Sequence, residues 1–131
     1  MQLTKNFNLS EFQCKCGCDM PEFVKKNVEQ LAKDLQVIRD KVGVGFTPNS
    51  AYRCTEHNAS IGGVKSSQHL KGKAADINIK GIEPAEVADL VEDLMKTEAI
   101  TKGGVGRYNS FTHVDIRGNN ARWNFTNKNN K

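Results

Sequence analysis

A stripe of apolar residues in the first third of the chain constrains the fold most. Between positions 24 and 42 these residues recur at steps of four, three, four, three and four, which is the spacing of one face of an α-helix. Pro21 lies just before the stripe, where a first helical turn tolerates proline, and Gly43 and Gly45 follow it, where a helix would end. The pattern predicts one long helix that packs against a core through Val24, Val28, Leu31, Leu35, Ile38 and Val42.

Two later segments alternate between apolar and polar residues, as half-buried strands do. In residues 74–79, Asp76 and Asn78 fall on one face of the predicted strand. In residues 110–118, His113 and Asp115 fall on one face, and Val114 lies on the other. If the two strands are neighbours, Asp76, His113 and Asp115 share a polar face.

The remaining segments complete the expected topology. Residues 81–97 predict a second helix with Pro84 near its start, residues 45–54 and 103–108 predict strands, and residues 55–67 predict a loop. The polar tail, residues 119–131, is expected to be frayed at its end. This order predicts an α+β fold in which a mainly antiparallel sheet packs against two principal helices. A chain of 131 residues is expected to form one domain over 1–131, with its core at about 7–123.

Composition excludes several classes of protein. Charged residues make up 26% of the chain and the formal net charge is only +4, and no basic stripe is interleaved with aromatic residues, so nucleic-acid binding is not expected. No apolar run approaches the length of a membrane span. No secretory signal is visible at the N-terminus. We therefore expect a monomer that is cytoplasmic when synthesised.

Three of the four cysteines crowd into the stretch CKCGC, as Cys14, Cys16 and Cys18, and the fourth is Cys54. Four thiols can bind a structural zinc ion, form two disulfides or remain reduced. The Cys-x-Cys-x-Cys spacing differs from the usual Cys-x2-Cys knuckle, so the sequence favours reduced thiols and leaves the other two states open.

The histidines point to a metal site. His69 lies upstream of Asp76, and His113 is the second histidine close to an in-strand aspartate. Two imidazoles and one carboxylate suit Zn²⁺, and three protein ligands leave a fourth position open, as in catalytic sites. Asp115 is then a carboxylate left over beside the metal, where a general base is needed.

The same residues carry a resemblance to a known family. Ser67, His69, Gly72, Ala74 and Asp76 fit the motif Ser-x-His-x-x-Gly-x-Ala-x-Asp, and a His-x-Asp pair follows at positions 113–115. From about Phe7 to Trp123 the chain resembles the zinc D-Ala-D-Ala carboxypeptidase family, which includes peptidoglycan peptidases and phage endolysins and shares its core with the hedgehog signalling domain.

The resemblance implies roles for individual residues. His69, Asp76 and His113 would bind Zn²⁺, and Arg53 would recognise the substrate. Gln68 would contact substrate or steady the oxyanion. Many relatives have a carboxylate three residues before the last zinc histidine, where this chain has Ser110.

That departure makes Asp115 the candidate general base. Tyr108 is a further candidate for the substrate cleft, whereas Trp123 is expected to anchor the core. Glu56 and His57 are the next candidates for the general base. His57 is also a candidate for a group that supports a metal ligand.

The implied function is a zinc metallopeptidase that cleaves stem or cross-link peptides of bacterial peptidoglycan, as a D-Ala-D-Ala carboxypeptidase or an endopeptidase. We expect a phage or prophage lytic enzyme that reaches the cell wall through a holin. The alternative is a zinc-containing module of the same fold that binds cell wall or a partner without cutting.

Overall fold

The computed structural model describes residues 1–126. The long helix that the apolar stripe predicts is α1 (Glu22–Val42), and it ends at Gly43, whose left-handed backbone lets its N–H bond to the carbonyl of Arg39. The second predicted helix is α3 (Pro84–Lys96), which starts with a capping box between Glu83 and Glu86. Both helix predictions are confirmed. No helix among the described residues is both long enough and apolar enough to span a membrane.

The sheet has four strands in the order β1-β3-β2-β4. Strand β3 (Thr112–Asp115) pairs antiparallel with both β1 (Ala74–Ile77) and β2 (Gly104–Arg107). Strand β4 (Ala121–Asn124) pairs parallel with β2. The predicted α+β class with a mainly antiparallel sheet is therefore confirmed.

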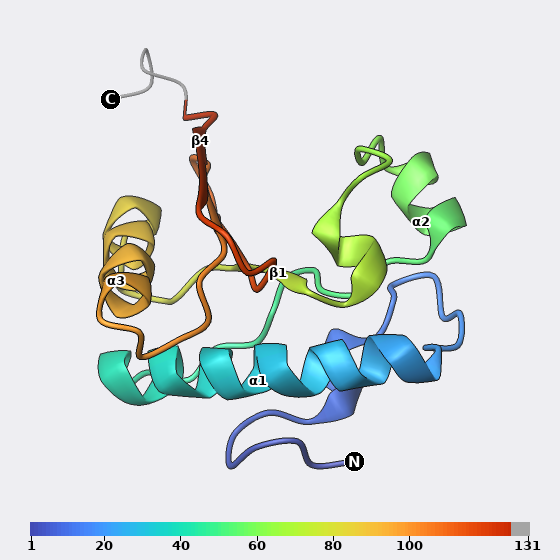
Figure 1. Ribbon diagram of the computed structural model, residues 1–131, viewed down its shortest axis with the longest axis horizontal. Coiled ribbons are helices and arrows are strands. Elements are labelled where there is room, and N and C mark those ends of the chain that lie inside the picture. Colours follow the sequence, from blue (N-terminus) through green and yellow to red (C-terminus); the bar gives the residue numbers. More distant parts are fainter. Residues whose placement is uncertain (127–131) are drawn as a thin grey trace.

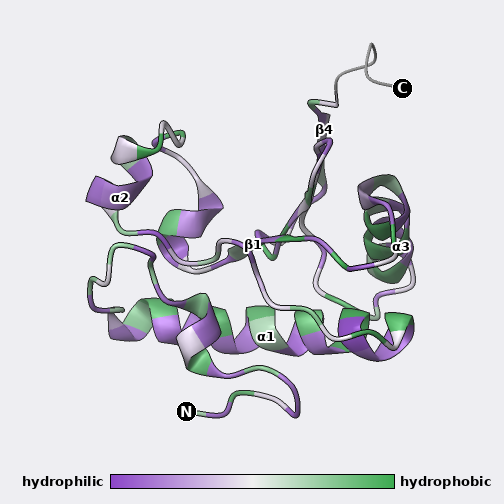
Figure 2. Cartoon of the chain, turned by 180° about the vertical axis from the view of Figure 1, so that it is seen from behind, coloured by the Kyte–Doolittle hydropathy of each residue, from purple (hydrophilic) through white to green (hydrophobic). Residues whose placement is uncertain are grey.

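The core lies between the sheet and the two long helices. Helix α3 packs on β2 and β3, and α1 runs beneath the strands (Figure 1). Buried side chains of the helices meet Ile77, Val105 and Val114 of the sheet. Apolar residues gather along α1 and α3, whereas α2 (Thr55–Ser60) is mostly hydrophilic (Figure 2).

Three local predictions were wrong. Residues 45–54 form no strand and meet the sheet at one bridge, Ser50 to Asp76, after Pro48, which has no N–H to donate to a ladder. Residues 55–60 form helix α2, because the sulfur of Cys54 accepts the N–H of His57 and caps it. Part of the tail forms β4, because Trp123 packs over Gly106 in β2. Residues 127–131 of that tail lie outside the described residues.

Two short 3-10 helices complete the chain, η1 (Leu9–Phe12) and η2 (Gln68–Lys71). Helix η2 ends at Gly72, which has a left-handed backbone and lies against Val24 and Val28 of α1. Any side chain at position 72 would collide with α1. This close approach brings the element that carries His69 against the long helix and holds it beside β1.

Truncation of a core residue in α1 should destabilise the whole domain. Leu31 is fully buried, and Leu31→Ala should lower the free energy of unfolding by about 2–5 kcal/mol. Phe23 lies on the same helix but is 61% exposed, so Phe23→Ala should change that free energy by less than about 0.5 kcal/mol. Urea denaturation followed by circular dichroism measures both. Equal losses in the two variants would contradict the assigned core face.

Candidate metal centre and active site

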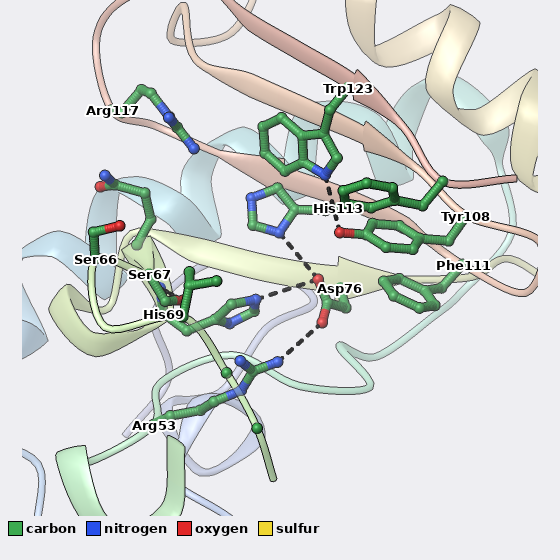
Figure 3. Close-up of a pocket in the computed structure, with 15 residues that line it drawn as sticks. Arg53, Ser66, Ser67, His69, Asp76, Tyr108, Phe111, His113, Arg117 and Trp123 are labelled. Carbon is green, nitrogen blue, oxygen red and sulfur yellow. Dashed lines mark hydrogen bonds and ion pairs between the residues drawn. The ribbon is translucent and has the colours of Figure 1, made fainter. Parts of the chain in front are cut away.

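Strand pairing brings the three predicted metal ligands together. Asp76 of β1 lies directly opposite His113 of β3 in the register of the sheet, and His69 approaches from η2. One ligand atom from each of the three residues lies within 4.8 Å of the others, and all three residues are buried. Figure 3 shows both imidazoles directed at the Asp76 carboxylate. The structure therefore brings these three residues together in one polar site.

The outer nitrogen of each imidazole has an oxygen acceptor. His69 Nδ1 lies 2.7 Å from the carbonyl oxygen of Ala51, and His113 Nε2 lies 2.7 Å from Asp115 Oδ2. A neutral imidazole carries only one N–H. Because these acceptors bind the outer nitrogens, the proton of each ring stays on its outer nitrogen. The inner nitrogens, His69 Nε2 and His113 Nδ1, then carry no hydrogen, and each presents a lone pair to the centre.

Those inner nitrogens lie 3.3 and 3.2 Å from the same oxygen, Asp76 Oδ1. Two lone pairs and a carboxylate oxygen repel one another unless a cation lies among them. The donor set, two nitrogens and one oxygen with the outer nitrogens fixed by oxygen acceptors, fits Zn²⁺.

The shifts in the pKa values of Asp76 and His113 also indicate that the centre favours positive charge. Burial on its own would raise the pKa of Asp76, but the interactions of its carboxylate with the His113 and His69 rings outweigh burial and hold that pKa well below its usual range. Burial would lower the pKa of His113, but the carboxylates of Asp115 and Asp76 outweigh burial and raise it. The site therefore favours a proton or a metal ion in its centre.

Asp115 lies behind His113, away from the cavity. Its side chain has no exposed surface, and Oδ2 faces His113 Nε2 and the guanidinium of Arg117, with Arg117 Nη2 at 2.8 Å. Oδ1 accepts the N–H of Gly104 at 2.8 Å and Nε of Arg117 at 2.9 Å. Burial would raise the pKa of Asp115, but hydrogen bonds from His113, Arg117 and Gly104 keep it well below its usual range.

Arg53 lies on the opposite side of the centre and lines the cavity. Its Nη2 is 3.3 Å from Asp76 Oδ2, Nη1 is 3.2 Å from Asn58 Oδ1, and Nε is 3.1 Å from Ser50 Oγ. Asn58 is itself buried and donates to the carbonyl of Val64. The guanidinium is thus held in place beside a metal ligand while it faces the cavity.

The cavity in front of the three ligands has a volume of about 500 Å³. Gln68 and Tyr108, both predicted to contact substrate, line it. Tyr108 stacks on Phe111 at 4.3 Å between ring centroids and accepts a hydrogen bond from Trp123 Nε1. Together with Phe125, these rings form an aromatic wall.

Trp123 was expected in the core, and that prediction was wrong. Its ring lies 4.9 Å from the His113 ring, between centroids, and the Arg117 guanidinium lies over it at 5.4 Å. The indole occupies space above Gly106, where any Cβ would collide with it. A glycine in β2 therefore lets Trp123 reach the cavity.

Among the described residues that line the cavity, Asp76 is the only carboxylate. Ser110, at the position where the resemblance implies an acid, is exposed and outside the lining. Glu56 and His57, on α2, do not line the cavity either.

Sequence reasoning missed the groups that hold the site in shape. No sequence pattern indicates the roles of Asn58 and the Ala51 carbonyl, because each role depends on a contact that forms only in the folded chain. Arg117 follows Asp115 by two residues, so the predicted strand over 110–118 puts both on one face. The alternation therefore contained a signal for Arg117. The four cysteines, whose state was left open, also converge: their sulfurs lie within 4.8 Å of one another.

Replacing one ligand should remove one zinc ion. Elemental analysis of purified His113→Ala should find one zinc per chain fewer than in the wild type, because the two remaining ligands bind weakly. His57→Ala replaces the third histidine, outside the cavity, and should keep the wild-type zinc content. Equal zinc content in His113→Ala and the wild type would refute the assignment.

Comparisons with protein families and with individual proteins both gave a match. The model of the family described as Peptidase M15 matches residues 5–115. The chain is 38% identical, over 71 residues, to a probable peptidoglycan L,D-endopeptidase, MepK, of Haemophilus influenzae, and the match covers 49% of this chain and 35% of that protein. The chain thus spans about a third of the length of this curated relative. Since the family match includes His69, Asp76 and His113 and most of the chain, the protein belongs to the peptidase M15 family.

Proposed function

We propose that this protein is a zinc-dependent peptidase that cleaves peptide bonds in bacterial peptidoglycan. The observation that carries the proposal is that His69 Nε2 and His113 Nδ1 both face the Asp76 carboxylate in the lining of a cavity. The name of the Haemophilus influenzae relative supports peptidoglycan as the substrate and an endopeptidase as the type of enzyme.

A zinc ion held by His69, Asp76 and His113 would supply Lewis acidity, which polarises a carbonyl group and lowers the pKa of water. The chain's own residues position the substrate. Arg53 presents a guanidinium to the cavity, and this group suits a carboxylate or a carbonyl oxygen of a peptide. The aromatic wall offers apolar surface for the rest of the peptide.

Asp115 acts in this proposal as a positioning residue, in place of the predicted role of general base. Its buried carboxylate faces His113 Nε2 and Arg117, with no surface on the cavity. By accepting the outer N–H of His113, it keeps the inner nitrogen available as a ligand.

Asp115→Asn separates these two roles. If Asp115 positions His113, the variant should bind zinc about 10–100-fold more weakly, as measured by competition with a chromophoric chelator. Asp93→Asn, at an exposed position on α3, is the matched control and should bind zinc as the wild type does. Wild-type zinc affinity together with a large loss of turnover in Asp115→Asn would restore the general-base role.

Digestion of purified muropeptides, with mass analysis of the products, tests the function. The wild type should release peptide fragments, a chelator should stop the reaction, and added zinc should restore it. His113→Ala should be inactive, and His57→Ala should retain activity. Loss of a single terminal residue would identify a carboxypeptidase, whereas cleavage within the stem or cross-link would identify an endopeptidase.

A binding module is the second candidate, and the observation that favours it is the absence of a second carboxylate from the described cavity lining. In that case, zinc-loaded protein would sediment with purified cell-wall sacculi and release no fragment from any muropeptide. That result would overturn the peptidase proposal.

A further inference from the structure

Four cysteine sulfurs meet at a second place in the molecule, outside the cavity. Cys14, Cys16 and Cys18 come from the turn that follows η1, and Cys54 immediately precedes α2. Each residue offers one sulfur, and all four sulfurs lie within 4.8 Å of one another. We propose that these four thiols bind one structural zinc ion, separate from the centre formed by His69, Asp76 and His113.

The spacing of the sulfurs fits a tetrahedral ion. The Sγ atoms of Cys14 and Cys16 are 3.3 Å apart, those of Cys16 and Cys54 are 3.4 Å apart, and those of Cys14 and Cys54 are 3.8 Å apart. Zn–S bonds of about 2.3 Å at tetrahedral angles place neighbouring sulfurs about 3.8 Å apart. Thiols that served packing alone would be expected to be buried, whereas Cys16 is exposed and Cys18 and Cys54 are half-buried.

The backbone around the cluster supplies donors to sulfur. The N–H of Cys54 points at Cys14 Sγ at 3.4 Å, and the N–H of His57 points at Cys54 Sγ at 3.5 Å. Such hydrogen bonds stabilise thiolate charge and orient the ligands. Gly17, whose positive φ of 85° suits glycine, turns the chain between Cys16 and Cys18.

The cluster lies next to the active site along the chain. Cys54 follows Arg53, which pairs with Asp76, and the Ala51 carbonyl, three residues earlier, faces His69 Nδ1. The N–H of Tyr52 bonds to the carbonyl of Phe12, so the N-terminal segment already touches this stretch. A metal ion on the four sulfurs would lock residues 51–54 to the N-terminal segment and so fix Arg53. The inference does not depend on the proposed peptidase activity.

Metal counting in paired variants tests the proposal. Wild-type protein purified under reducing conditions should hold two zinc ions per chain, and Cys16→Ser and His113→Ala should each hold one. The double variant should hold none. A single zinc in the wild type, lost entirely in His113→Ala, would overturn the second site, and iron in the cluster would overturn the choice of zinc.

Cobalt substitution keeps the test valid if the cysteine variant fails to fold. Wild-type protein and His113→Ala loaded with Co²⁺ should both show an intense near-ultraviolet band from thiolate-to-cobalt charge transfer, which nitrogen and oxygen ligands do not give. Thiol reagent should react with the zinc-loaded protein only after a chelator is added. Absence of the cobalt band, four freely reactive thiols, or two disulfides in the mass spectrum would each refute the proposal.

Discussion

The antiparallel pairing of β1 with β3 is the constraint on which the site depends. Its register sets Asp76 opposite His113 and Ala74 opposite Asp115. A shift by one residue would turn these side chains into the core and the apolar ones toward the cavity. Because Ala75, Ile77 and Val114 are buried on the other face, the hydrophobic core enforces the register. The metal centre is therefore positioned by packing on the far side of the same sheet.

A second constraint comes from the stretch 50–54, which has no regular secondary structure before α2. Ser50 bonds to β1, the Ala51 carbonyl orients His69, and Arg53 pairs with Asp76. Irregular backbone needs external partners to hold one conformation. Here those partners are β1, η2, the N-terminal segment and the cysteine cluster, so one short stretch connects the two groups of potential metal ligands.

The sequence predicted those parts whose signal is periodic. The stripe of α1 and the alternation around Asp76 and His113 each repeat within one element, and they predicted the helix, two paired strands and the shared face of Asp76 and His113. The role of His69 as a ligand came from the family motif. Features that depend on one tertiary contact were missed: β4 forms because Trp123 covers Gly106, and Arg53 is held by Asn58. The burial of Asp115 behind His113 was missed for another reason, since strand alternation gives the face of a residue but not its depth.

In the proposed metal centre, His69 and His113 offer specific inner nitrogens to one metal ion beside Asp76. Crystallography with anomalous diffraction on both sides of the zinc absorption edge tests it directly. A zinc peak is expected in contact with His69 Nε2, His113 Nδ1 and Asp76, with the outer nitrogens still bonded to Ala51 and Asp115. A zinc-soaked crystal with no peak among these residues, or with zinc on the outer nitrogens, would contradict it.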